Sequence, residues 1–110
     1  MSGVKKVVLV YATWCPHCVP TAVDPVGEIA AELGAEAVLL DIDKRTEEAD
    51  AMVREHGDWC PDYIVPQLFF EYEDGKVQHV LTGYSEAVDL TRKAFTNLRS
   101  SSFYREKLKA

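Results

Sequence analysis

The spacing of apolar residues divides the first half of the chain into two strands separated by a helix. The segments 5–12 and 36–43 are mostly apolar, as buried strands of a parallel pair are. Between them, within 16–33, apolar residues recur at helical spacing ahead of Gly34, the expected end of the helix: Val26, Ile29, Ala30 and Leu33. Pro25 is expected to kink this helix because proline removes a backbone donor. The order strand, helix, strand predicts a right-handed βαβ unit.

Two further helices are predicted in the second half of the chain. Thr46 is placed to cap a short helix that ends at Gly57, with three residues on its inner face: Ala49, Met52 and Val53. After Gly83 breaks the chain, a last helix spans 85–99 and buries residues at helical spacing: Ala87, Leu90, Ala94 and Leu98. Residues 100–110 are interpreted as a C-terminal extension, either one more short helical piece or a frayed end.

A hairpin is predicted between these two helices. Segment 67–73 alternates apolar and polar residues with Phe69 as the exception, and segment 76–82 returns after the turn signal Asp74-Gly75. The element order β-α-β-α-β-β-α predicts an α/β fold, with a four-stranded mixed sheet covered by helices on both faces. We expect a single domain over 1–110 with its core at about 5–99, because no repeat or linker divides the sequence.

Charge and composition narrow the function classes. The chain is 47% hydrophobic and 27% charged, as a globular protein is, and its net charge of −6 disfavours nucleic-acid binding. Fifteen of the 18 acidic residues lie in 19–75, whereas the last twelve residues hold four basic residues and one acidic residue. No segment approaches the ~20 apolar residues of a membrane span, and the apolar run 7–12 is shorter than a signal peptide needs. We therefore expect an unprocessed cytoplasmic monomer with neither nucleic acid nor membrane as a partner.

Two of the three cysteines stand at the predicted junction of the first strand and the first helix, in Cys15-Pro16-His17-Cys18. The free amides and partial positive charge of a helix N-terminus stabilise a thiolate, which favours Cys15 as the nucleophile. Cys18 lies one turn further on, close enough to form a disulfide with Cys15. His17 can donate a hydrogen bond or a charge near the sulfur, which favours the thiolate further.

The sequence resembles the thioredoxin-like superfamily. Trp14-Cys15-Pro16-His17-Cys18 is similar to its redox motif, and Ile64-Val65-Pro66, Asp74-Gly75-Lys76 and Gly83 are similar to the rest of its active face. The resemblance implies a thioredoxin-like fold and a cis peptide bond between Val65 and Pro66. It also implies that Cys15 and Cys18 are the catalytic residues of a protein disulfide oxidoreductase, with a site shaped by six other residues: Trp14, Pro16, His17, Val65, Pro66 and Gly83.

By the same resemblance, the dithiol itself carries the electrons, so no cofactor and no metal are expected. Protein disulfides are the expected substrates, and an external reductase or a small thiol would recycle the pair. The cytosolic assignment favours a reductant, whereas Pro16-His17, which is similar to the pair in periplasmic disulfide oxidases, favours an oxidant. The direction of electron flow is therefore left open.

Several alternatives stay open beside this hypothesis. A glutaredoxin-like activity, a metal or iron–sulfur module that uses Cys15, and a redox-inert adaptor are each compatible with the motif. Cys60 is either a third redox thiol or a loop cysteine packed with Trp59, and we favour the second interpretation. His56 and His79 have no partner that the sequence identifies, and we interpret both as solvated side chains.

Overall fold

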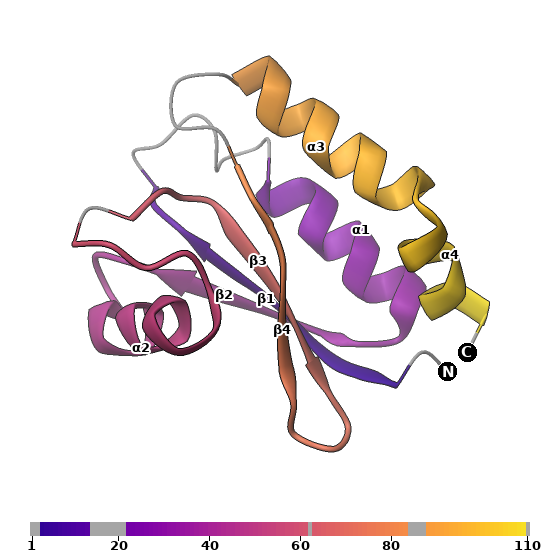
Figure 1. The fold of residues 1–110 in the computed structure, drawn as a ribbon, viewed down its shortest axis with the longest axis horizontal. Coiled ribbons are helices and arrows are strands. Elements are labelled where there is room, and N and C mark those ends of the chain that lie inside the picture. Colours follow the sequence, from indigo (N-terminus) through magenta and orange to yellow (C-terminus); the bar gives the residue numbers. More distant parts are fainter. Residues whose placement is uncertain (1–2, 14–21, 62, 84–87, 110) are drawn as a thin grey trace.

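The computed structural model describes residues 3–13, 22–61, 63–83 and 88–109. These residues form a sheet with helices against both of its faces (Figure 1). The elements in chain order are β1 (Val4–Tyr11), α1 (Val23–Leu33), β2 (Glu36–Asp41), α2 (Thr46–His56), β3 (Gln67–Tyr72), β4 (Val77–Thr82), α3 (Val88–Ser100) and α4 (Ser102–Lys109).

The four strands form one mixed sheet in the order β2-β1-β3-β4. The strand β1 pairs in parallel with β2 and antiparallel with β3, and β3 forms an antiparallel hairpin with β4. This arrangement confirms the predicted α/β class, the mixed four-stranded sheet and the hairpin. The apolar sequence of β1 follows from burial on both faces of the sheet, since its residues contribute to a hydrophobic cluster on each side.

Two hydrophobic layers lie on opposite faces of the sheet. Helices α1, α3 and α4 cover one face and α2 covers the other (Figure 1). Successive residues of β1 serve the two layers alternately, since Val7 and Leu9 belong to the first and Val8 and Val10 to the second. Phe69, which breaks the alternation of its strand, is fully buried in the layer under α2. Both faces of the hairpin's first strand are therefore covered.

The predicted end of α1 is confirmed. Gly34 has φ 67° and ψ 32°, the left-handed conformation that favours glycine. Its N–H donates to the carbonyl oxygen of Ala31, and the N–H of Ala35 donates to that of Ala30 (N···O 3.3 and 2.9 Å). Pro25 lies in the first turn of α1 as described, where its missing N–H has no intrahelical partner to lose. The part of the predicted helix at 16–21 lies outside the described residues.

The prediction that Thr46 caps α2 is wrong. Thr46 is already the first helical residue, and its hydroxyl donates to the carbonyl oxygen of Ile42 (2.7 Å). The capping position belongs to Arg45, whose guanidinium pairs with the Glu48 carboxylate at 2.6 Å and whose side chain caps no backbone N–H. The threonine hydroxyl thus bonds the turn after β2 and does not cap a backbone N–H of α2.

The predicted inner face of α3 is displaced by one residue. Thr91 and Phe95 are buried, whereas Leu90 is 50% exposed; Ala94 and Leu98 are half-buried, and Ala87 lies outside the described residues. The shift arises because α3 packs through the ring of Phe95, which is 2% exposed and belongs to the core cluster on this face of the sheet.

The last residues of the chain form α4, which packs onto the same layer. Tyr104 is 1% exposed within the core, and the ring of Phe103 stacks on Phe70 with centroids 6.0 Å apart. The Tyr104 hydroxyl donates to the Glu32 carboxylate, which also pairs with Arg99 at 2.6 Å. These contacts join α1, α3 and α4. The chain termini lie together at the end of the molecule opposite the beginning of β3 (Figure 1).

Candidate functional site

Three chain segments meet at one end of the sheet. Because β3 runs antiparallel to both neighbours, the end of β1, the start of β3 and the end of β4 lie side by side. The register pairs Gln67 with Val10 on one side and with Thr82 on the other. Ala12 and Val65, just beyond these paired residues, belong to the same hydrophobic cluster. This end of the sheet therefore brings the end of β1, which precedes the Cys15–Cys18 motif in sequence, next to the segment that contains Val65 and Pro66.

The Val65-Pro66 peptide bond is cis, which confirms that expectation. Val65 is 8% exposed and Pro66 is buried. The N–H of Gly83 donates to the Pro66 carbonyl oxygen at 2.8 Å, so the end of β4 is bonded to this proline. A Cβ at position 83 would lie 2.7 Å from Pro66 Cδ and 3.1 Å from Thr91 Cγ2. Only glycine fits between the proline ring and α3 without displacing one of them.

Val65, Pro66 and Gly83, three of the predicted site residues, are thus brought together at one end of the sheet. The other predicted site residues, namely Trp14, Cys15, Pro16, His17 and Cys18, lie outside the described residues.

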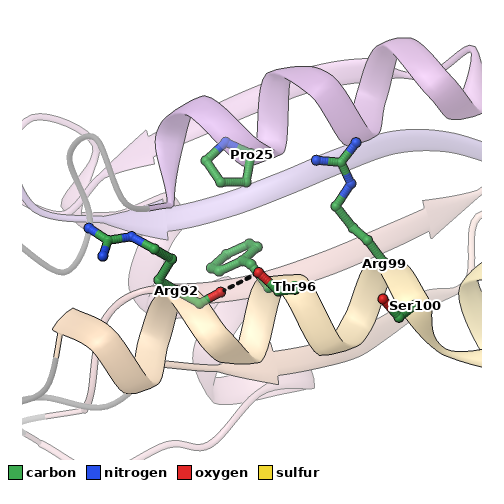
Figure 2. A pocket seen from close by; sticks show the side chains of 6 residues that line it. Pro25, Arg92, Thr96, Arg99 and Ser100 are labelled. Carbon is green, nitrogen blue, oxygen red and sulfur yellow. Dashed lines mark hydrogen bonds between the residues drawn. The ribbon is translucent and has the colours of Figure 1, made fainter.

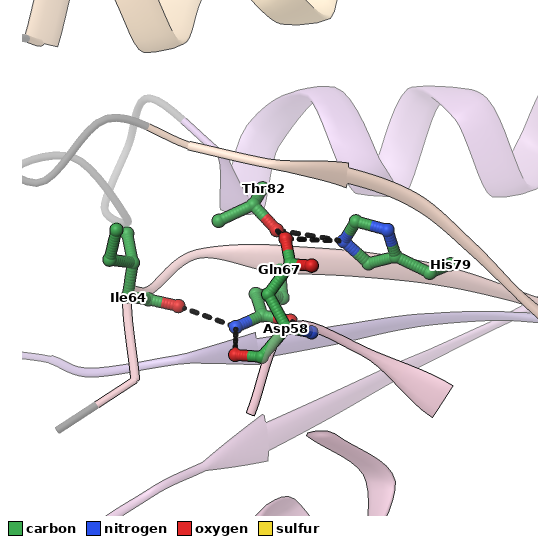
Figure 3. Close-up of polar contacts among 5 residues, drawn as sticks. All are labelled: Asp58, Ile64, Gln67, His79 and Thr82. Atoms are coloured by element: carbon green, nitrogen blue, oxygen red, sulfur yellow. Dashed lines mark hydrogen bonds and ion pairs between the residues drawn. The ribbon is translucent and has the colours of Figure 1, made fainter. Parts of the chain in front are cut away.

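Gln67 is a further residue of this site, which sequence reasoning missed. Its side chain is completely buried and bonds the segment that leads to Pro66 (Figure 3). The Gln67 Nε2 donates to the Ile64 carbonyl oxygen at 2.9 Å and, at 3.4 Å, to that of Asp58, while Gln67 Oε1 accepts from the Asp58 N–H at 3.1 Å. One signal could have found it. Gln67 lies on the same face of its strand as the apolar Phe69, which indicates that its side chain is buried. A buried side-chain amide needs hydrogen-bond partners.

A polar cluster connects the same segment to β4. The Thr82 hydroxyl donates to the Asp58 carboxylate at 2.8 Å, and His79 Nε2 lies 2.7 Å from the Thr82 hydroxyl oxygen (Figure 3). The His79 ring also lies 3.7 Å from the Asp58 carboxylate and contacts the edge of Phe69. The interpretation of His79 as a solvated side chain is therefore wrong, because the ring is half-buried and lies between Thr82 of its own strand and Asp58, which is far away in sequence.

Two aromatic residues in the described part of the segment 58–64, Trp59 and Tyr63, contact α2. The Tyr63 hydroxyl donates to the Asp50 carboxylate at 2.8 Å, and burial together with this carboxylate raises the pKa of Tyr63 above its ordinary value. Trp59 is 39% exposed, contacts the ring of Tyr63 and has the Arg54 guanidinium 4.4 Å from its ring centroid. Cys60 is an exposed free thiol. The segment therefore has a bonded inner side and an outer side that carries an indole and a thiol.

A cavity of about 300 Å³ lies between α1 and α3 (Figure 2). Its apolar lining is Pro25 and Phe95, and two arginines flank it. Each guanidinium already has carboxylate partners: Arg92 pairs with Asp89, and Arg99 pairs with glutamates of α1. The cavity consequently offers a small apolar surface and no unpaired guanidinium.

The described residues hold no group of three or more His, Cys, Asp or Glu side chains that could bind a metal ion. The helices in those residues include none long and apolar enough to cross a membrane. No protein-family model, curated protein or solved structure matches the chain. A functional proposal must therefore rest on the residues themselves.

Proposed function

We propose that this protein is a thiol–disulfide oxidoreductase with a thioredoxin-like fold, which exchanges disulfides with protein substrates in the cytoplasm. The observation that carries the proposal is the meeting of three segments at one end of the sheet. The end of β1, which leads in sequence to Cys15, lies beside the Val65-Pro66 segment and Gly83. Cys15 follows Ala12 by three residues, and three residues of extended chain span at most about 11 Å.

The sequence of elements supports the same proposal. The elements β1 to α3, in the order β-α-β-α-β-β-α, and the sheet order β2-β1-β3-β4 agree with the fold that the resemblance implies, and α4 is an addition at the end. The cis Val65-Pro66 bond agrees with it as well.

The proposed reaction proceeds in two exchanges. The Cys15 thiolate attacks one sulfur of a substrate disulfide, which forms a mixed disulfide and releases the other substrate sulfur as a thiolate that takes up a proton. The Cys18 thiol then loses its proton and attacks the Cys15 sulfur, which releases the second substrate thiol and leaves a Cys15–Cys18 disulfide. Two electrons pass to the substrate, and an external reductase or a small thiol returns them. Each step is reversible, so the same residues can oxidise a substrate dithiol.

Reduction of insulin disulfides tests the proposal directly. With dithiothreitol as the electron source, the wild type is expected to accelerate insulin precipitation, and Cys15→Ser is expected to abolish the acceleration because the nucleophile is gone. Cys18→Ser should instead accumulate the mixed disulfide on Cys15. Cys60→Ser is the matched control, since it removes an exposed thiol outside the proposed pair and should keep the wild-type rate. Full activity of Cys15→Ser would contradict the proposal.

Equilibration against glutathione buffers then determines the direction of electron flow. A potential of the Cys15–Cys18 pair near or below the cytosolic poise makes the protein a reductant, and a potential well above it makes the protein an oxidant.

A further inference from the structure

We propose that Gln67 is a positioning residue for this exchange: its buried amide orients the Ile64–Val65 peptide, so that the Val65 N–H faces the substrate chain. The inference rests on the proposed function and adds a determinant of substrate binding. The resemblance described above implies that the Val65 backbone pairs with a substrate chain, and Gln67 acts on that backbone from within the fold.

Gln67 is held rigidly enough for this role. Its residue pairs with Val10 in β1 and with Thr82 in β4, so neighbouring strands hold its backbone on both sides. Its side chain is completely buried, and the amide makes three hydrogen bonds, all to the backbone of residues 58 and 64. The shortest of these, from Gln67 Nε2 to the Ile64 carbonyl oxygen, is 2.9 Å long. The Ile64 carbonyl is thereby directed inward.

The geometry of the peptide bond transmits this orientation to Val65. A trans peptide is planar, and its C=O and N–H point in opposite directions. Within the described residues the only cis bond is Val65-Pro66, so the preceding Ile64–Val65 bond is trans. The Val65 N–H therefore points away from Gln67, and it has no hydrogen-bond acceptor in the described part of the chain. A donor fixed in this direction can pair with the main chain of a substrate.

The amide of glutamine satisfies both requirements of this position. Its nitrogen donates to Ile64 while its oxygen accepts from the Asp58 N–H. A glutamate has the same shape and keeps the acceptor, but when ionised it cannot donate to the Ile64 carbonyl. Gln67→Glu therefore removes one interaction with little change in volume, and its neutral form can restore that interaction.

The decisive experiment measures steady-state insulin reduction by Gln67→Glu and the wild type between pH 5 and pH 8. At pH 8 we expect KM to rise about tenfold with kcat within about twofold, because substrate binding is impaired and the thiols are unchanged. Burial raises the pKa of a carboxyl group, so protonation should restore the donor as pH falls. The ratio of the variant's KM to the wild-type KM should then approach one near pH 5. An unchanged KM at pH 8, or a ratio independent of pH, would overturn the inference.

Thr82→Val is the matched control. It breaks the hydrogen bond to the Asp58 carboxylate but leaves the bond from Gln67 to Ile64 intact. Its KM should stay within about twofold of the wild type and show no rescue at low pH. A tenfold rise in KM here would mean that any loosening of the segment 58–64 has the same effect, which contradicts a specific role for Gln67.

Hydrogen–deuterium exchange separates this inference from the proposed function. In Gln67→Leu and Gln67→Glu, exchange at residues 58–65 should accelerate, while the middle of β4 should keep wild-type protection. A wild type that fails to reduce insulin overturns the proposed function, and with it the catalytic meaning of Gln67. An active wild type whose Gln67 variants keep normal exchange and normal KM overturns the positioning role alone. If Gln67→Leu does not fold, Gln67→Glu decides both readouts.

Discussion

Replacing Gly83 by alanine tests the close packing of β4 against the proline at the candidate site. The added Cβ would lie 2.7 Å from Pro66 Cδ, 3.0 Å from Pro66 Cγ and 3.1 Å from Thr91 Cγ2. Two of these atoms belong to a stiff proline ring, and the third belongs to a fully buried side chain of α3. The backbone of Gly83 is outside the left-handed region, so the effect of the substitution is steric. The substitution must therefore move the proline, the helix or both.

The size of the effect follows from two opposing contributions. Overpacking by one carbon in a close-packed region destabilises by about 1–3 kcal/mol. Alanine reduces the entropy of the unfolded chain, which offsets about 0.4–1 kcal/mol of that loss. We expect Gly83→Ala to lower the free energy of unfolding by about 1–2 kcal/mol, which corresponds to a decrease in Tm of about 4–8 °C for a domain of this size.

Urea denaturation followed by circular dichroism measures this change, with Gly27→Ala as the matched control. Gly27 lies within α1, and nothing lies within 4 Å of a Cβ placed there. The same substitution should therefore stabilise the protein by about 0.5–1 kcal/mol, because alanine favours a helix more than glycine does. A Gly83→Ala variant as stable as the wild type, beside a stabilised Gly27→Ala, would refute the close approach to Pro66.

Two further predictions concern the layer under α3 and α4. Phe95→Ala should lower the free energy of unfolding by about 3–5 kcal/mol, because the ring is 2% exposed, whereas Leu90→Ala on the exposed side of α3 should change it by less than about 1 kcal/mol; equal losses in urea denaturation would contradict the orientation of the helix. The Tyr104 hydroxyl, followed by Arg99, lowers the pKa of Glu32 from 4.5, so the ionised carboxylate stabilises the fold above pH 4.5 and this contribution is lost as pH falls through the lowered value. Tyr104→Phe should therefore be less stable at pH 7 and should lose less stability between pH 7 and pH 3 than the wild type does. Parallel pH profiles for the two proteins would rule out this coupling.

The strands and their order along the chain could be predicted because their signals are local and strong. The two apolar runs separated by one helix, and the turn signal at Asp74-Gly75, restrict the topology to few possibilities. Gly34 was predictable for a similar reason, since a glycine directly after the last apolar position of a helix is a common helix end. These features depend on neighbours in sequence.

The orientation of α3 and the partners of the polar residues depend on contacts between distant segments. Leu90 fits the apolar stripe of the helix and Thr91 does not. The close approach of Thr91 to Gly83 and the burial of Phe95 nevertheless decide which side of α3 faces the sheet. The sequence identifies Gln67 and His79 only as polar strand residues, because Gln67 bonds the segment 58–64 and His79 contacts Asp58 and Phe69, which lie outside its own strand. The cis Val65-Pro66 bond was expected only through the resemblance to a family, since spacing alone does not specify it.

The placement of the two chain ends has a practical consequence. Both lie at the end of the molecule opposite the beginning of β3, and therefore away from Pro66 and Gly83 (Figure 1). A fluorescent protein or a surface tether attached at either terminus would leave the candidate site open to large substrates. A short linker that joins the two termini would also permit new ends to be cut in the turn between β3 and β4, which yields a circular permutant that keeps every contact around Pro66.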